Sequence, residues 1–282
     1  MKILLKSVGL VARYDKKNAI KLVEKLTEHL RNKGLEVYIE DTLEGKIDTN
    51  AKFSPLSSMK TDFIITIGGD GTILRTCIAA PKPEPPILAI NMGVRGFLTE
   101  VEPKDAFIAV EKCLKGEYKI EKCFKLTVSS GEAPMPDALN DVVISTGEPA
   151  KVLYMEIFKD DKPILKCQAD GLILSTQTGS TGYSLSAGGP VVDKELDAFV
   201  LTPICSLTVF RSIVFPAETR VTVKVIRPQK MLILIDGNYR QVVTAKEPTL
   251  TVTRSKNMSS FIRFKDDFYS RLRSRLLFRG MG

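Results

Sequence analysis

The chain has 282 residues, a net charge of +8 and 44% hydrophobic residues, which together predict two domains and a sizeable core. Lys2 and Lys6 interrupt the first apolar run, so the start of the chain lacks the residue order of a signal peptide. The longest uncharged stretch, 171–192, is too rich in Gly, Ser and Thr to suit a membrane span. We therefore expect a cytoplasmic protein without a membrane partner.

The positive charge is concentrated near the end of the chain. Residues 254–279 carry eight Lys and Arg against two Asp, a net of +6, which leaves about +2 of the total +8 for the rest. Such a tail is typical of a solvated helix face or of a site for anionic ligands, and no nucleic-acid-binding motif accompanies it. We expect no nucleic-acid partner.

The cysteines and the histidine do not indicate a disulfide framework or a metal site. The five cysteines are scattered and include no Cys-x-x-Cys pair, which predicts reduced thiols rather than a disulfide framework. The single histidine, His29, is far from them in sequence, so we expect no metal site built from these residues. We expect His29 to be a solvated side chain on a helix.

The first 120 residues alternate between strand and helix patterns. Apolar residues at helical spacing over 16–33 end at Gly34, and the short apolar run 62–67 is typical of a strand buried on both faces. This alternation predicts an α/β domain with an open parallel, Rossmann-like sheet and right-handed crossovers. The expected elements are strand 3–12, helix 16–33, strand 35–39, strand 62–67, helix 73–80, strand 87–90 and helix 103–114.

The pattern changes after about residue 120. Polar and apolar residues alternate over 151–169 around the turn "KDDK", which predicts a hairpin. Further strands at short spacing, at 219–226, 230–236 and 248–255, predict a mainly-β, sandwich-like domain.

A helix is expected again at 266–278. Its apolar residues share one face, which predicts docking of that face with the arginines outside; they are Phe268, Tyr269, Leu272 and Leu276. We expect an α/β domain over 1–120, a β domain over 121–260, and a segment 261–282 that packs back on the first domain.

The sequence "GGDGT" at 68–72 directly follows the strand 62–67. In an open α/β sheet, ligands bind at the carboxyl ends of strands, and glycines before a helix let the backbone approach an anion. Asp70 would repel a phosphate there, so its carboxylate has another role: it holds a divalent cation or takes a proton from an attacking hydroxyl. The alternative is a plain turn in which Asp70 caps the helix.

Further candidate residues lie outside the glycine loop. The loop 175–190 is rich in hydroxyls and poor in charge, which suits a ribose and the edge of a base; the alternative is a linker. The pair Asn140–Asp141 could read a purine edge and a sugar diol, or simply form a turn. Arg75 and Arg95 are candidate anion contacts, or surface arginines.

These motifs occur together in an order that resembles the NAD kinase family, in its prokaryotic or archaeal type. The resemblance covers nearly the whole chain. The motifs that carry it are "GGDGT" at 68–72, "NMGVRGFL" at 91–98, "LND" at 139–141, "ADGLILSTQTGSTGYSLSAGGP" at 169–190 and "TPIC" at 202–205.

The resemblance implies a phosphofructokinase-like first domain and a phosphotransferase. The γ-phosphoryl of ATP, or of polyphosphate, would pass to the 2′-hydroxyl of the adenosine ribose of NAD, with Mg²⁺ accompanying the donor. The family also implies a homodimer or homotetramer. Asp70 matches the catalytic aspartate that accepts the hydroxyl proton.

The remaining implied positions bind the two substrates. Gly68, Gly69, Gly71 and Thr72 match the phosphate loop, Asn140 reads the adenine, and Asp141 faces the ribose hydroxyls. Asp170 matches a carboxylate near the nicotinamide ribose, and Phe97 an aromatic that borders the dinucleotide. The loop around the adenosine is matched by Thr178, Thr181, Gly182, Tyr183 and Ser186.

The sequence departs from the family pattern at several positions. Asp141 stands where a glutamate is usual, Gln177 where a proline is usual and Gly182 where an alanine is usual. Two other functions are alternatives to this one. A lipid kinase of the diacylglycerol type shares the glycine loop but needs an apolar acceptor pocket, and a non-catalytic sensor would bind the dinucleotide without turnover.

Overall fold

The structure is a computed structural model that describes residues 5–93, 96–131, 133–148 and 151–277. The chain divides into two compact units. Unit 1 contains Met1–Cys123 and Met258–Gly282, and unit 2 contains Phe124–Asn257. Two strands, β6 (Lys119–Ser130) and β17 (Thr249–Arg263), run from one unit into the other.

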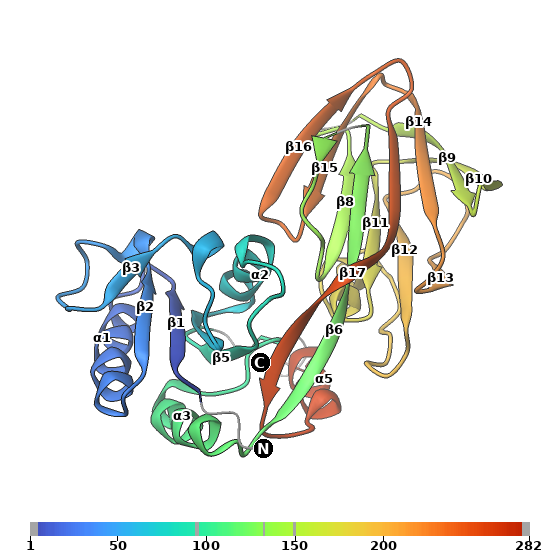
Figure 1. The fold of residues 1–282 in the computed structure, drawn as a ribbon. Helices are drawn as coiled ribbons and strands as arrows, with labels where there is room; N and C mark the ends of the chain where they lie inside the picture. Colours follow the sequence, from blue (N-terminus) through green and yellow to red (C-terminus); the bar gives the residue numbers. More distant parts are fainter. Residues whose placement is uncertain (1–4, 94–95, 132, 149–150, 278–282) are drawn as a thin grey trace. The chain divides into compact units, whose positions relative to one another are not determined.

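The core of unit 1 is a parallel sheet whose strands follow the order β5-β4-β1-β2-β3 (Figure 1). The bounds are β1 Ser7–Ala12, β2 Glu36–Glu40, β3 Lys52–Ser54, β4 Phe63–Gly68 and β5 Ile87–Asn91. The end of β17 adds to the outer side of β5, where Phe261 pairs with Ile87 in parallel. The strand order reverses between β1 and β4, and ligands of open α/β sheets bind at such a switch point.

Both faces of this sheet carry apolar residues, so helices cover both faces. The helices α1 (Lys17–Asn32) and α3 (Ala106–Lys115) share one buried cluster with β1, β2, β4 and β5. The helix α2 (Asp70–Ala79) contacts β1 and β4. The helix α2 connects β4 to β5, and α1 connects β1 to β2. These two connections run in opposite directions across the sheet. Because both crossovers are right-handed, α1 and α2 lie on opposite faces.

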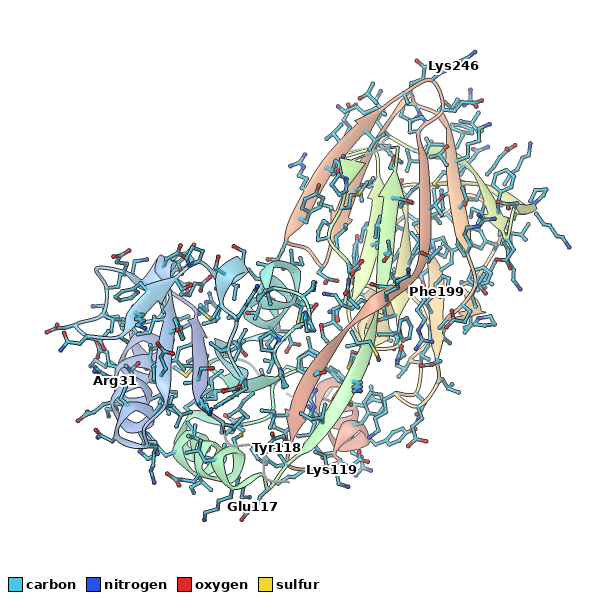
Figure 2. The ribbon with its side chains drawn as sticks, in the orientation of Figure 1. Arg31, Glu117, Tyr118, Lys119, Phe199 and Lys246 are labelled. Carbon is cyan, nitrogen blue, oxygen red and sulfur yellow. The ribbon has the colours of Figure 1, made fainter. Side chains whose placement is uncertain are left out.

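Unit 2 is a sandwich of antiparallel strands, as the sequence predicted. One sheet holds β10-β9-β14-β17 and the other β13-β12-β11-β8-β15-β16. Apolar residues from both sheets form one cluster; Phe199 of β12, labelled in Figure 2, is fully buried in it. The bounds are β8 Asp141–Ser145, β9 Leu153–Lys159, β10 Lys162–Ala169, β11 Gly171–Thr176, β12 Ala198–Ile204, β13 Ile213–Pro216, β14 Val221–Arg227, β15 Lys230–Ile235 and β16 Tyr239–Thr244.

Short elements complete the two units. They are β7 Ala133–Pro134, α4 Tyr183–Ser186, α5 Phe268–Leu277 and the 3-10 turns η1 Asp41–Leu43, η2 Leu56–Ser58, η3 Pro103–Asp105 and η4 Gly179–Thr181. No helix among the described residues has the length and apolar character that a membrane crossing requires.

Two expectations about side chains were wrong. His29 is not simply solvated: its Nε2 lies 2.9 Å from Glu111 Oε1, and its ring meets Phe107 edge-on, so it ties α1 to α3. The arginines of α5 are not all outside, because Arg271 is only 8% exposed. The basic tail is also partly neutralised, since Arg254 pairs with Asp197 and Glu218.

Candidate active site

The glycine loop lies at the carboxyl end of β4, next to the reversal of strand order. The helix that follows begins at Asp70 rather than at Ile73 as expected, with Gly69 as the residue before it. Gly68 is required here because a Cβ on it would lie 2.2 Å from Thr72 Oγ1. The loop therefore presents the N-terminus of a ten-residue helix, an arrangement that favours anions.

The N-cap position of α2 is Gly69, and the carboxylate of Asp70 reaches another segment. It accepts hydrogen bonds from the backbone N–H groups of Phe97 (3.0 Å) and Leu98 (3.2 Å), in the segment after β5. A Cβ on Gly96 would lie 2.0 Å from Asp70 Oδ1, so only glycine leaves room for the carboxylate. The alternative of a plain capped turn is wrong, and two backbone donors instead fix the orientation of the half-buried carboxylate.

The other predicted residues of unit 1 have separate surroundings. The guanidinium of Arg75 donates two hydrogen bonds to the carboxylate of Glu40, which is 2% exposed. Arg75, predicted as an anion contact, is therefore already paired with a buried carboxylate of the same chain. The ring of Phe97 is 9% exposed and packs on Phe268 of α5, with ring centres 6.2 Å apart. Arg95 lies outside the described residues.

In unit 2, one buried aspartate holds the segment before β8. Asp236 accepts hydrogen bonds from the N–H groups of Leu139 (2.8 Å), Asn140 (2.7 Å) and Asp141 (3.0 Å). Burial raises the pKa of Asp236, although the three donors oppose that rise. Sequence reasoning missed this residue, because Asp-Gly after a strand indicates only a hairpin turn.

Two predicted side chains converge beside Gly182. A Cβ built on Gly182 would lie 3.9 Å from both Asn140 Nδ2 and Asp141 Oδ2. Within the described residues, the buried Oδ1 of Asn140 has no hydrogen-bond partner. Burial, and then the negative charge of Asp236, raises the pKa of Asp141 to about 7. An amide and a carboxylate side by side are suited to a base edge and a diol.

Some hydroxyls of the loop 175–190 donate hydrogen bonds to backbone carbonyls of unit 2. Thr176 Oγ1 donates to the carbonyl of Leu139 (2.6 Å), and Ser180 Oγ donates to the carbonyl of Gln177 (2.7 Å). Gly179 must be glycine, because a Cβ there would lie 2.1 Å from the carbonyl oxygen of Asn140. The loop is thus a built part of unit 2, packed on the 139–141 segment, and the linker interpretation is wrong.

The remaining predicted residues of this loop differ in exposure. Thr181 is buried, Thr178 and Gly182 are half-buried, and Tyr183 and Ser186 are exposed. Asp170, just before β11, is exposed and donates its N–H to the carbonyl of Ile204.

Sequence comparison decides the family. The sequence model of the ATP-NAD kinase N-terminal domain matches residues 8–118, and that of the C-terminal domain matches residues 139–264. An NAD kinase of Methanothermobacter thermautotrophicus is 39% identical over 277 residues, 97% of each protein. The chain belongs to the NAD kinase family. An NAD kinase of Pyrococcus furiosus is 40% identical over 93% of this chain and 95% of its own length.

Solved structures of NAD kinase relatives share the fold. An NAD kinase from Archaeoglobus fulgidus in complex with ATP matches with a TM-score of 0.78 and 27% identity, covering 98% of this chain and 100% of that one. Yeast NADH kinase complexed with NADH matches with a TM-score of 0.89 and 22% identity, covering 100% of this chain and 90% of that one.

One departure from the NAD kinase pattern has a clear structural setting. Gln177, where the family usually has proline, is 7% exposed. In the described part of the chain, its buried Oε1 has no hydrogen-bond partner. The chain therefore places an additional amide in the loop that the resemblance assigns to the adenosine.

Proposed function

We propose that the protein transfers the γ-phosphoryl group of ATP to the 2′-hydroxyl of the adenosine ribose of NAD, which gives NADP. The observation that carries this proposal is the carboxylate of Asp70, oriented by the N–H groups of Phe97 and Leu98 at the N-terminus of α2. The full-length similarity to NAD kinases supports it and gives no support to a lipid kinase.

In this reaction, Asp70 would accept the proton of the 2′-hydroxyl as its oxygen attacks the γ-phosphorus. One oxygen–phosphorus bond forms, the bond from the γ-phosphorus to the β,γ-bridging oxygen breaks, and ADP leaves with those electrons. Phosphoryl transfer has a loose transition state, so alignment and charge compensation supply most of the rate. The start of α2 and the loop from Gly68 to Thr72 would contribute backbone N–H groups toward the donor phosphates.

We assign the dinucleotide to the residues of unit 2. Asn140 would contact the adenine edge with its amide, and Asp141 would accept hydrogen bonds from the ribose hydroxyls. The surrounding loop residues would enclose the adenosine, with Asp170 toward the nicotinamide ribose; the loop residues are Thr178, Thr181, Gly182, Tyr183 and Ser186. The buried Oδ1 of Asn140 has no partner among the described residues, which supports this assignment, because a buried amide oxygen is costly unless a ligand satisfies it.

We propose Mg²⁺ as the cation that accompanies the donor. Among the described residues, no group of three or more His, Cys, Asp or Glu side chains is placed to hold a metal. Mg²⁺ is often bound by one or two carboxylates together with substrate phosphates. The residues present therefore fit a cation held mainly by the donor, with Asp70 as the neighbouring carboxylate. When bound, it would compensate the charge of the transferred group.

The decisive experiment replaces Asp70 with asparagine, which keeps the size of the side chain but cannot take the proton. We expect NADP formation by Asp70→Asn to fall about 10²- to 10⁴-fold, the usual contribution of a general base. Asp41→Asn, an exposed carboxylate in η1, is the matched control and keeps full activity. Wild-type turnover in the Asp70→Asn variant would refute the role.

The same assay separates the alternatives. Labelled ATP is supplied with NAD or with diacylglycerol, and the phosphorylated product identifies the acceptor. A sensor would bind NAD in calorimetry and form no product with any donor or metal. ATP and polyphosphate are compared as donors in parallel.

We also propose a cytoplasmic homodimer or homotetramer, from the family resemblance. Light scattering of the purified protein measures the oligomeric state. A monomer at all concentrations would contradict this proposal.

A further inference from the structure

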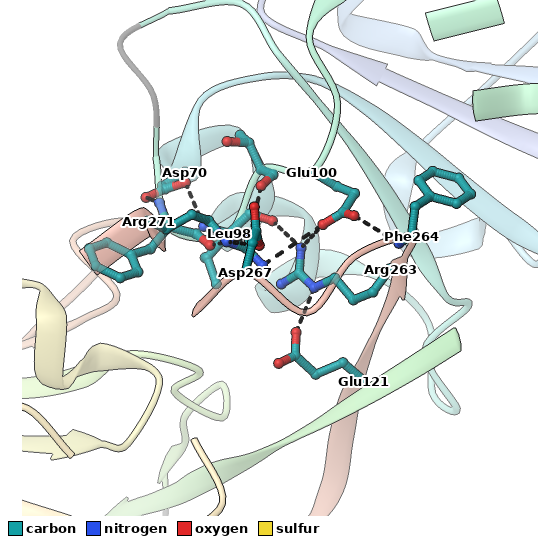
Figure 3. Close-up of polar contacts among 10 residues, drawn as sticks. Asp70, Leu98, Glu100, Glu121, Arg263, Phe264, Asp267 and Arg271 are labelled. Atoms are coloured by element: carbon teal, nitrogen blue, oxygen red, sulfur yellow. Dashed lines mark hydrogen bonds and ion pairs between the residues drawn. The ribbon is translucent and has the colours of Figure 1, made fainter. Parts of the chain in front are cut away.

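The segment that orients Asp70 is held on its other side by two arginines from the end of the chain (Figure 3). Arg271 of α5 donates through Nη1 to the carbonyl oxygens of Phe97 (2.9 Å) and Thr99 (3.0 Å). Arg263, the last residue of β17, donates to the carbonyl oxygen of Leu98 (2.8 Å). Three successive carbonyls therefore point at guanidinium groups, and two N–H groups of the same segment point at Asp70.

Both arginines are buried in a cluster of charges. Arg263 is 7% exposed and Arg271 is 8% exposed. Arg271 Nε lies 2.7 Å from Asp267 Oδ1, and its Nη2 lies 3.9 Å from Glu100 Oε2. Arg263 pairs with Glu100 and with Glu121. Two guanidiniums thus face three carboxylates, and these ion pairs fix the planes of the guanidinium groups.

One peptide unit links Arg271 to Asp70 through two hydrogen bonds. The carbonyl of Phe97 accepts from Arg271, and the N–H of Leu98, in the same planar unit, donates to Asp70 Oδ1. The unit is rigid and its C=O and N–H point in opposite directions. A guanidinium that fixes the carbonyl therefore also fixes the direction of the N–H that holds the carboxylate.

We propose that Arg271 is a positioning residue for Asp70, acting through the peptide between Phe97 and Leu98. The inference rests on the proposed function in that Asp70 is the base. It gives the C-terminal helix a role in the chemistry, because removing Arg271 takes the guanidinium donor away from the carbonyls of Phe97 and Thr99 and lets the segment turn. Substrate binding should change little, since Arg271 is buried and donates to backbone carbonyls.

Two substitutions of Arg271 test this inference. Arg271→Ala removes the guanidinium. Arg271→Lys keeps the charge but loses the rigid plane in which Nη1 donates to both carbonyls while Nε lies against Asp267. We expect kcat to fall about 10- to 100-fold in both variants, the cost of a small misplacement of a reacting group, with the KM values for NAD and ATP within about threefold of wild type, as for interactions made mainly in the transition state. Arg31, an exposed arginine of α1 (Figure 2), supplies the matched controls Arg31→Ala and Arg31→Lys.

Two measurements distinguish positioning from loss of folding. Added guanidinium should restore part of kcat in Arg271→Ala and have no such effect on Arg31→Ala. In the Asp70→Asn background, Arg271→Lys should reduce kcat no further, because residues that act through one group are not additive. Additive losses, or a folded Arg271 variant with wild-type kcat, would overturn the inference.

A readout independent of activity keeps the two proposals apart. Hydrogen exchange at the amides of Phe97 and Leu98 should speed up at least about tenfold in Arg271→Lys, because the segment that carries these N–H groups is no longer held in its orientation toward Asp70. If the wild-type protein formed no NADP, the proposed function would fail while this measurement still decided whether Arg271 orders the segment. Unchanged exchange in a folded Arg271→Lys would contradict the positioning role.

Discussion

At the scale of single residues, the nearby carboxylate of Asp70 requires a glycine at position 96. A Cβ at this position would lie 2.0 Å from Asp70 Oδ1, a distance that no packed structure tolerates. Gly96→Ala should therefore push the carboxylate away from the N–H groups of Phe97 and Leu98. We expect kcat for NADP formation to fall about 10- to 100-fold, because small displacements of a reacting group have large effects on rate.

A neighbouring glycine supplies the control. A Cβ on Gly93 would meet no atom of the described residues within 4 Å, so Gly93→Ala should keep kcat close to wild type. Steady-state kinetics of the two variants, with circular dichroism to verify folding, makes the comparison. Equal activity of the two variants would mean that the carboxylate tolerates displacement.

The buried pair Asp141 and Asp236 predicts an unusual dependence of stability on pH. The pKa of Asp141 is raised by burial and by Asp236 to about 7, whereas an aspartate in an unfolded chain has a pKa near 3.9. Between about pH 4 and 7 the folded state therefore binds a proton that the unfolded state has released. The contribution of this group to the free energy of unfolding is largest at low pH and is lost as pH rises through about 7.

The variant Asp141→Asn isolates this effect, because its amide imitates the protonated carboxyl. We expect the free energy of unfolding of the variant to exceed that of wild type by roughly 2–4 kcal/mol above pH 8, and the difference to shrink toward pH 5. Urea unfolding from pH 5 to pH 8.5 measures both proteins in the absence of nucleotides. A difference that stays constant over this range would contradict the raised pKa.

At the scale of elements, the turn of the hairpin β9–β10 has two residues in the left-handed conformation. The residues Asp160 and Asp161 have φ values of 48° and 65°, the left-handed conformations of a type I′ turn. Asp161→Gly should raise the free energy of unfolding by about 0.5–1 kcal/mol, because glycine adopts this conformation without steric cost. The lost ion pair of Asp161 with Arg220 is exposed and contributes little.

Thermal unfolding measures this prediction, with Asp161→Val as the opposite control. A β-branched residue is strained at a positive φ, so valine should lower the melting temperature while glycine raises it. If both variants moved the melting temperature in the same direction, strain at this turn would not be the cause.

The sequence predicted elements well where local periodicity and burial agree. The strand at 62–67, the helix at 16–33 and the hairpin at 151–169 all have a clear apolar period, and they lie close to the bounds in the structure. The strand Lys52–Ser54 was missed because three residues carry no period. The helix α2 begins three residues before its expected start, because Asp70, Gly71 and Thr72 all have low helix propensity and the sequence gives no local signal for a helix there.

The candidate site was predictable only in part. The glycine loop, Asn140 and Asp141 have local signals, such as glycines after a buried strand and an amide beside a carboxylate. Asp236 and Arg271 have none, because their roles arise from contacts with residues about 95 and 174 positions away in the chain. Charge alone suggested solvated arginines in the tail, whereas the two hydrogen bonds from Arg271 to the carbonyls of Phe97 and Thr99 exist only once the fold brings this segment to it.

At the scale of the whole molecule, the two units differ in how the chain builds them. Unit 2 is one continuous segment, and its apolar cluster extends from Phe124 to Val252, entirely within it. Unit 1 is discontinuous, because residues from the end of the chain complete it. Phe261 pairs with Ile87 at the edge of the sheet and is fully buried, and Ile262 belongs to the main apolar cluster of this unit.

This difference predicts unequal behaviour of fragments. Residues 124–257 should fold alone, because a cluster of this size within about 130 residues is sufficient for a stable domain. Residues 1–123 should not, because without 258–282 the strand β5 becomes an exposed apolar edge and Glu100 loses both arginines. A fusion of 1–123 to 258–282 through a short Gly/Ser linker should restore cooperative folding. Circular dichroism melts of the three proteins test this, and a cooperative transition of 1–123 equal to that of the fusion would show that the C-terminal segment is dispensable for unit 1.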